Sequence, residues 1–201
     1  MRIKTESRRN AILDTAAQAF LEAGYQNTSM SQIALRVGGS KGTLYNYFTS
    51  KEEIFLEAMD RIGERQFFAA FTNLKMSEDI GMALKKFGAT LIQSLCSPEA
   101  IALRRILIAE AGRSDIGRLF FEQGPQKASH MVESMLKAAM DAGQLRESDP
   151  RIAGDHLRGL LESEYFEKCL LGVIASPDAR QSRQAANRAV EIFLAAYKPT
   201  E

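Results

Sequence analysis

Residues 29–48 read SMSQIALRVGGSKGTLYNYF, and this stretch decides the fold of the first part of the chain. Ser29 and Gln32 have the spacing of a capping box, in which each side chain pairs with a backbone N–H at the start of a helix. Ser40 is placed to cap a second short helix over residues 41–48. Two glycines lie in the short turn between the helices. This spacing predicts a helix-turn-helix, whose second helix can enter the major groove of DNA.

The exposed start of the second helix carries residue types that suit contacts with DNA. Bases are read by side chains that reach their edges, whereas phosphates are held by hydrogen-bond donors on the flanks of the reading helix. We predict that bases are contacted by Lys41, Gly42, Thr43 and Tyr45. We predict that phosphates are contacted by Ser29 or Thr28, and by Asn46, Tyr47 and Lys51. A helix-turn-helix that serves only as a packing element is the alternative.

The rest of the chain reads as helical, because apolar residues recur at intervals of three and four and the alternation typical of strands is nearly absent. Gly24 is expected to end the first helix in the left-handed conformation, and Ser50 with Glu53 is expected to form a second capping box. Four of the five prolines are expected to open helices, including Pro177 after Ser176. The sequence therefore predicts an all-α protein of about nine helices, over residues 5–23, 29–37, 41–48, 50 to beyond 71, 77–95, 98–111, 116–143 with a break at Gly124–Pro125, 150–175 and 177–197.

Composition is that of an ordinary soluble protein, with 45% hydrophobic and 25% charged residues and a net charge of +1. The charge is uneven, because residues 1–51 hold seven basic and three acidic residues. This local excess favours a nucleic-acid partner for the first part of the chain. Two distant cysteines indicate neither a disulfide framework nor a metal site, and no run of about 18 apolar residues occurs. We therefore expect a cytoplasmic protein that is not inserted in a membrane.

Residues 10–55, reading NAILDTAAQAFLEAGYQNTSMSQIALRVGGSKGTLYNYFTSKEEIF, resemble the DNA-binding domain of TetR-family regulators nearly throughout. Residues 104–125, reading RRILIAEAGRSDIGRLFFEQGP, resemble the C-terminal domain of AcrR-like and AefR-like members. One departure concerns Gly39, which stands where the family commonly has a valine that seals the turn. A looser turn, or a slightly reoriented second helix, is expected from this change.

The resemblance implies a transcriptional repressor that binds a palindromic double-stranded DNA operator as a homodimer and is released by a small molecule. It implies a three-helix DNA-binding domain over residues 1–50. A larger helical domain over residues 51–201 is expected to bind the effector and to form the dimer. The family's base contacts fall on Lys41, Gly42, Thr43 and Tyr45, and its phosphate contacts fall on Ser29, Asn46, Tyr47 and Lys51.

Pockets between helices are lined by aromatic and flexible apolar side chains with a few polar groups. On helix identity we predict effector contacts from Phe67, Phe71, Phe87, Leu91, Arg105, Glu110, Met131 and Tyr165, each with a core or surface role as the alternative. We predict that the last two helices form the dimer. The apolar face that marks the final helix consists of Ala186, Ala189, Val190, Phe193, Ala196 and Tyr197. The alternative is that this face belongs to the core of one chain.

Two other classes of function stay open at this point: a helical module that grips a protein partner, and an enzyme. His130 and His156 lie on different predicted helices without further ligands at metal-binding spacing, so no metal or cofactor is predicted. The acidic run of Glu162, Glu164 and Glu167 fits a solvated or interface face better than a catalytic site. Because no nucleophile and base are recognisable together, we predict that the protein is not an enzyme.

Overall fold

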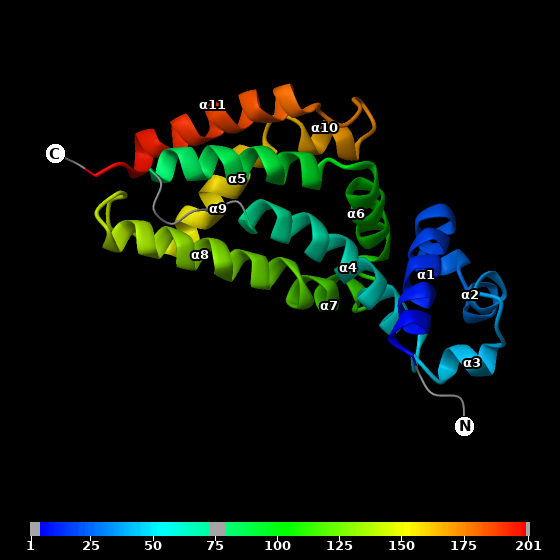
Figure 1. The fold of residues 1–201 in the computed structure, drawn as a ribbon. Helices are drawn as coiled ribbons and strands as arrows, with labels where there is room; N and C mark the ends of the chain where they lie inside the picture. The colour runs from blue at the N-terminus through cyan, green and yellow to red at the C-terminus, as the bar shows by residue number, and fades with distance from the viewer. Residues whose placement is uncertain (1–4, 73–78, 200–201) are drawn as a thin grey trace. The chain divides into compact units, whose positions relative to one another are not determined.

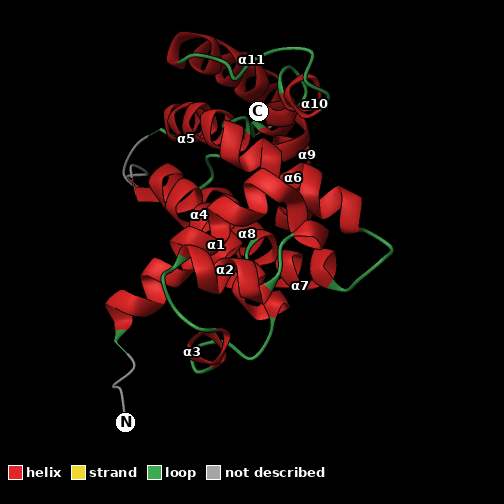
Figure 2. Ribbon diagram, turned by 90° about the vertical axis from the view of Figure 1, so that its right-hand side faces the viewer, coloured by secondary structure: helices red, strands yellow, loops and turns green. Residues whose placement is uncertain are grey.

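The computed structural model describes residues 5–72 and 79–199, and for residues 63–72 it describes only the helical backbone. The described residues form α-helices joined by loops and contain no strand (Figure 2). The all-α prediction is therefore confirmed. In chain order the helices are α1 (Glu6–Asn27), α2 (Met30–Arg36), α3 (Lys41–Tyr45), α4 (Lys51–Thr72), α5 (Ile80–Leu95), α6 (Pro98–Glu110), α7 (Ile116–Gln123), α8 (Pro125–Asp141), α9 (Pro150–Glu162), α10 (Phe166–Leu170) and α11 (Ala179–Tyr197) (Figure 1).

Capping residues set most of the helix starts. The capping box of Ser29 and Gln32 is present with both of its hydrogen bonds, and the Ser40 hydroxyl accepts from the N–H of Thr43. The Asp149 carboxylate accepts from the first backbone N–H groups of α9, directly before Pro150. These side chains satisfy N–H groups that have no partner within the helix. The starts predicted for α2, α3 and α9 are confirmed to within one residue.

Three local predictions are wrong. The final helix begins at Ala179 rather than Pro177, because Asp178 and Gln181 form a complete capping box. The short helix α3 ends at Tyr45 rather than Phe48, and a turn follows it. Gly24 has a positive φ of 78° but a ψ of 171°, which is not the left-handed helical conformation, so α1 kinks there and continues for one more turn.

The described residues contain eleven helices where about nine were predicted. One extra break is the expected one at Gly124, which precedes Pro125 at the start of α8. The other separates α9 from α10 at residues 163–165, where the sequence carries neither glycine nor proline to signal it. Apolar periodicity alone cannot reveal such a break, because residues on both sides remain at helical spacing.

The chain divides into two compact units, one of Met1–Gly63 with Ala102–Phe121 and one of Glu64–Ile101 with Glu122–Glu201. The core of the first unit includes Ile12, Phe20, Ile33, Leu44 and Phe55, together with Leu103, Leu107 and Ile116 from α6 and α7. The first unit therefore contains the helix-turn-helix and a later segment of the chain. The functional boundary that we place at residue 50 remains a prediction.

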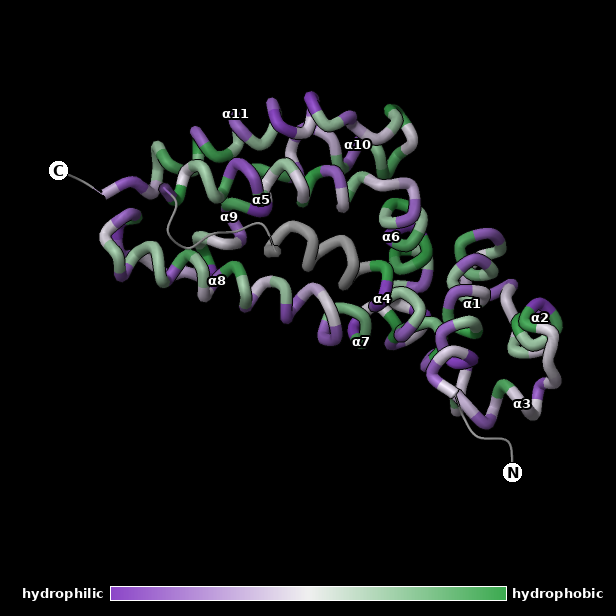
Figure 3. The backbone as a smooth tube through the Cα atoms, viewed as in Figure 1, coloured by the Kyte–Doolittle hydropathy of each residue, from purple (hydrophilic) through white to green (hydrophobic). Residues whose placement is uncertain are grey.

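In the second unit α11 packs along α5 and against α9, and α9 also packs on α8 (Figure 1). Along α11 hydrophobic and hydrophilic segments alternate from turn to turn, as expected for a helix with one apolar face (Figure 3). The residues buried on that face are Ala186, Ala189, Val190, Phe193 and Tyr197. The prediction that this face forms the dimer interface is wrong, because the face lies in the core of one chain. Ala196 is the exception and is exposed.

Free thiols occur in this second core at Cys96 and Cys169, and both are buried. The pKa of Cys96 is raised to about 12, mainly because the thiol is buried and further because Cys169 lies beside it. The Cys96 thiol therefore stays protonated at neutral pH, and a protonated buried thiol is unreactive.

Among the described residues, no helix is both long and apolar enough to cross a membrane.

The crossing of α5, α9 and α11 depends on Gly88, which has no side chain to hold the helices apart. A Cβ atom at this position would lie 2.6 Å from Cδ2 of Leu161 and 3.2 Å from Cβ of Ala186. We expect Gly88→Ala to destabilise the protein by about 1–3 kcal/mol, because the Cβ of Ala186 cannot rotate away. Gly117→Ala is the control, since nothing lies within 4 Å of a Cβ there and a helical alanine is neutral or favourable. Urea unfolding of the two variants measures the difference, and equal midpoints would contradict the close packing.

Candidate nucleic-acid interface

The helix-turn-helix buries several apolar side chains in the first core, although Leu35 of α2 is exposed, and it leaves one surface of α3 open. Ile33 of α2 and Leu44 of α3 are buried, as is Phe48 just after α3. Lys41, Gly42, Tyr45 and Asn46 are exposed, and Thr43 is half-buried. All four predicted base-contacting residues therefore lie on α3, and at least part of each is accessible.

Two pairs of side chains organise the exposed part of α3. The ammonium of Lys41 lies 5.8 Å from the centre of the Tyr45 ring, one helical turn away, at the distance of a cation–π contact. The Ser40 and Thr43 hydroxyls lie 3.0 Å apart, and the Ser40 hydroxyl also accepts from the backbone of Thr43. Tyr45 is 46% exposed, so the contact with Lys41 leaves part of this residue accessible.

The predicted phosphate-contacting residues differ in how free their side chains are. Asn46 is exposed where α3 ends, and Tyr47 is half-buried against the first core. Ser29 is exposed while its hydroxyl caps α2. Thr28 is buried, and its hydroxyl donates to the carbonyls of α1 that precede it. Of the two alternatives at the start of α2, Ser29 is therefore the accessible one.

Lys51 begins α4 and is tied to the end of α1. Its ammonium donates to the Tyr25 carbonyl at 2.9 Å and lies 4.1 Å from the centre of the Tyr25 ring. Burial lowers the pKa of Lys51, and the negative charge of Glu110 acts in the opposite direction. The ammonium has three donors, so one bond to a carbonyl leaves others for a phosphate.

The start of α4 is also held to the turn after α3. The Ser50 hydroxyl accepts from the N–H of Glu53, and the Glu53 carboxylate accepts from both the N–H and the hydroxyl of Thr49. Burial alone would raise the pKa of Glu53, but the bonds from Thr49, the charge of Arg9 and a bond from Ser50 together lower it. The loop that follows α3 is therefore fixed to the first turn of α4.

Glu110 was predicted to contact an effector, and it lies in the same unit as the helix-turn-helix. Its side chain is buried, and its carboxylate accepts from Nε2 of Gln26 at 2.6 Å. Gln26 belongs to the last turn of α1, next to the residue that holds Lys51. The end of α6 is therefore bonded to the end of α1, a contact between residues far apart in sequence that no local pattern signals.

The other predicted effector residues fall in several places. Arg105 is exposed on α6 in the first unit. In the second unit Phe87 is part of the core, and Leu91 and Tyr165 pack against it. Met131 is 37% exposed on α8. The side chains of Phe67 and Phe71 lie outside the described residues, although their backbone belongs to α4.

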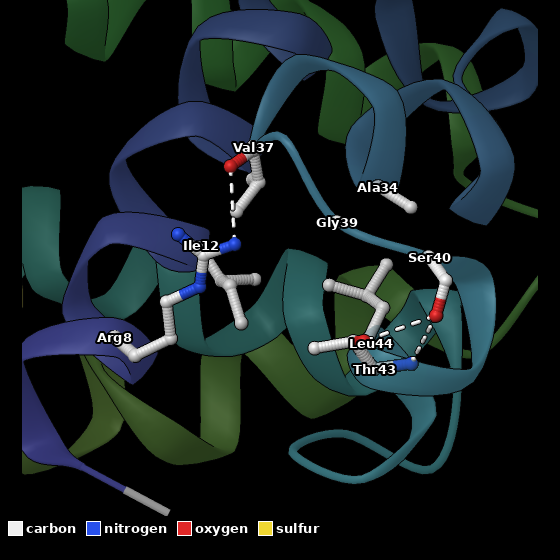
Figure 4. Close-up of a pocket in the computed structure, with 8 residues that line it drawn as sticks. All are labelled: Arg8, Ile12, Ala34, Val37, Gly39, Ser40, Thr43 and Leu44. Atoms are coloured by element: carbon white, nitrogen blue, oxygen red, sulfur yellow. Dashed lines mark hydrogen bonds between the residues drawn. The ribbon is translucent and has the colours of Figure 1, made fainter.

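Arg8 is a residue of this unit that the sequence reasoning missed. Its Nη2 atom donates to the carbonyl of Val37, just after α2, at 3.1 Å (Figure 4). The same atom donates to the carbonyl of Gly38 at 3.5 Å. An arginine on an amphipathic helix gives no sign of which carbonyl it will meet. Among the side chains of residues 5–62 and 79–199, no three from histidine, cysteine or acidic residues gather as a metal site would require.

Two family models match the chain. The model described as bacterial regulatory proteins of the tetR family matches residues 12–58. The model described as the C-terminal domain of AefR-like transcriptional repressors matches residues 82–199. Together they cover the helix-turn-helix and most of the second unit.

Solved structures of similar fold include transcriptional regulators. A TetR-family transcriptional regulator from Mesorhizobium loti MAFF303099 is 29% identical, with a TM-score of 0.85 over 98% of this chain and 100% of its own. The flavonoid-responsive regulator FrrA is 28% identical, with a TM-score of 0.79 over the same shares of the two chains.

Sequence relatives match a shorter part of the chain. The transcriptional activator FasR of Mycolicibacterium smegmatis is 38% identical over 60 residues, and the match spans 30% of this chain and 27% of that relative.

Proposed function

The chain belongs to the TetR family of bacterial transcriptional regulators, and on that premise we propose that it is a ligand-responsive repressor that binds a palindromic operator as a homodimer. A small molecule bound by the second unit releases it from DNA. The observation that carries the proposal is the open surface of α3, where Lys41 and Tyr45 stand exposed on a helix fixed by caps at the start of α2 and α3. The protein acts as a regulator, not as an enzyme.

The reading surface combines base contacts from α3 with phosphate contacts around it. Lys41, Gly42, Thr43 and Tyr45 face the bases, and Ser29, Asn46, Tyr47 and Lys51 face the backbone. The first 51 residues carry more basic than acidic side chains, which supports binding to a polyanion. Fixed caps on α2 and α3 support this role too, because a rigid element places side chains against bases more accurately than a loop does.

The dimer forms through the outer seam between α9 and α11, and not through the buried face of α11. Ile192 on α11 is 58% exposed although it is a large aliphatic residue. On α9, Ile152 is partly exposed and Gly159 has no atom within 4 Å of where a Cβ would stand. Because α9 and α11 pack on each other, exposed aliphatic and small residues on these two helices can let the helices of a second chain approach and complete a four-helix bundle.

The effector site belongs to the second unit, where α5, α8 and α9 surround the core. Phe87, Leu91, Met131 and Tyr165 are its candidate lining residues there. Arg105 and Glu110 belong to the first unit, and Glu110 serves to join α6 to α1. A flavonoid-responsive member of similar fold supports a small organic effector, because that relative is described as responding to one.

The electrostatic part of binding is tested with Lys51→Ala. Loss of one phosphate contact is expected to weaken binding to all DNA sequences alike, and to reduce the slope of log affinity against log salt by about one unit. Fluorescence anisotropy on a labelled duplex at several salt concentrations measures both quantities. Lys137→Ala is the control, because Lys137 is an exposed side chain of α8 paired with Asp141. An unchanged slope for Lys51→Ala would show that Lys51 contacts no phosphate and serves only to bond the carbonyl of Tyr25.

A further inference from the structure

The turn between α2 and α3 encloses a small apolar hollow that opens to the surface (Figure 4). Its lining comes from three helices and from the turn itself, and consists of Arg8, Ile12, Ala34, Val37, Gly39, Ser40, Thr43 and Leu44. Gly39 lies in the turn, where any other residue would place a side chain. The hollow therefore lies where the turn, α1 and the start of α3 meet.

Arg8 spans this hollow from α1. Its guanidinium donates to the carbonyls of Val37 and Gly38, which follow the last turn of α2 and have no partner within that helix. A cation at the C-terminal end of a helix is also favoured by the helix dipole. The arginine therefore ties the turn to α1 by bonds to the backbone, which do not depend on the side chains of α2.

The geometry at Gly39 indicates that the guanidinium stands where a side chain would otherwise seal the turn. A Cβ atom built on Gly39 would lie 3.3 Å from Nη2 of Arg8 and 3.8 Å from Cβ and Cγ2 of Thr43. The φ of Gly39 is not positive, so other residues can adopt this backbone without strain. A side chain at position 39 would therefore touch α1 on one side and α3 on the other.

We propose that Arg8 is a positioning residue for DNA recognition, which fixes the angle of α3 by bridging α1 to the turn at Gly39. The proposal rests on the proposed function, because it concerns the placement of Thr43 and Lys41 on DNA. Arg8 acts through the turn and touches no base. An apolar side chain at position 39 would also fix the angle of α3, by packing between α1 and α3. Either this side chain or the Arg8 bridge is therefore sufficient to position α3.

A direct contact between Arg8 and a phosphate is the competing explanation, and two measurements separate it from positioning. Removing a phosphate contact lowers the salt slope of binding by about one unit, whereas removing a positioning contact leaves the slope unchanged. A side chain at position 39 adds no charge. It can therefore restore the position of α3 but cannot replace a lost phosphate contact.

The experiment compares four proteins: the parent, Arg8→Ala, Gly39→Val, and the variant with both changes. Each is titrated with a labelled duplex that the parent binds, at several salt concentrations. Arg8→Ala is expected to bind about tenfold more weakly with an unchanged salt slope, as for one lost charge-assisted hydrogen bond. The double variant is expected to recover most of this loss. Unchanged affinity in Arg8→Ala, or a reduced slope without recovery in the double variant, would overturn the proposal.

Urea unfolding of the same four proteins gives a second readout that does not require DNA. The stability effects of the two changes are expected to be non-additive, because the Cβ of a new side chain at position 39 would lie only 3.3 Å from Nη2 of Arg8. Additive effects would overturn the proposed bridge. A parent that binds no duplex, while the unfolding cycle still shows coupling, would instead contradict the proposed function.

Discussion

Phe193→Glu is expected to unfold the second unit of the protein. Phe193 is 1% exposed, and its ring stacks on that of Tyr197 with centroids 4.5 Å apart. The change removes this packing and places a carboxylate in an apolar core. Loss of a buried phenylalanine costs about 3–5 kcal/mol, and burial of an unpaired charge adds to this. The total approaches the stability of a whole domain, about 5–15 kcal/mol.

Ile192→Glu, one residue earlier, is expected to leave the protein folded but to prevent dimer formation. The side chain is mostly exposed within one chain, so the charge does not enter the core. In the proposed dimer each chain would place such a charge at the α9 and α11 seam. We therefore expect a folded monomer. Circular dichroism with urea unfolding checks the fold, and analytical ultracentrifugation checks the oligomeric state.

Asn187→Glu is the matched control for these two variants. Asn187 is exposed on α11 and lies away from the seam, so this variant should remain a folded dimer if the parent is one. A stable dimer of Ile192→Glu would remove the seam from the interface. A cooperatively folded Phe193→Glu would contradict the packing of α11 against α5.

Lys41→Ala is expected to relax the choice of base at one position in each half of the operator. Lys41 is exposed in the first turn of α3, and a lysine there can pair with O6 and N7 of a guanine. Loss of the pair is expected to cost about 1–3 kcal/mol at that position only. Titration of Lys41→Ala against duplexes with single base changes measures the effect.

Lys51→Ala supplies the comparison for the Lys41 prediction, because a lost phosphate contact weakens all sequences alike. The two variants remove the same charge from neighbouring parts of the same unit. Lys41→Ala should therefore change the order of preference among the duplexes, and Lys51→Ala should leave that order unchanged. An unchanged order of preference in both variants would show that Lys41 does not contact the bases.

Local patterns predicted the parts of the fold that depend on residues close in sequence. The capping box at Ser29 and the cap at Ser40 were both predictable, because a capping side chain bonds to a backbone group three residues away. Apolar periodicity also predicted most of the helices, although it missed the break between α9 and α10. The exposed surface of α3 was also predictable, since Leu44 and Phe48 mark its buried side.

Contacts between distant residues were not predictable. Periodicity identified the apolar face of α11 around Phe193 but could not say whether α5 or a second chain covers it. The bond between Glu110 and Gln26 joins residues 84 positions apart, and the bond from Arg8 to Val37 joins residues 29 positions apart. Their sequence context gives only a charged residue on a helix. The position of these groups depends on how the helices pack.

Selection of binding sites from random DNA by the parent protein tests the central claim most directly. A two-fold dimer presents its two α3 helices to successive major grooves about 34 Å apart. The selected sites are therefore expected to be pseudo-palindromes, with half-sites separated by about one helical turn or a small multiple of it. Selection of no symmetric sequence, or recovery of random DNA alone, would contradict a dimer that reads its operator through α3.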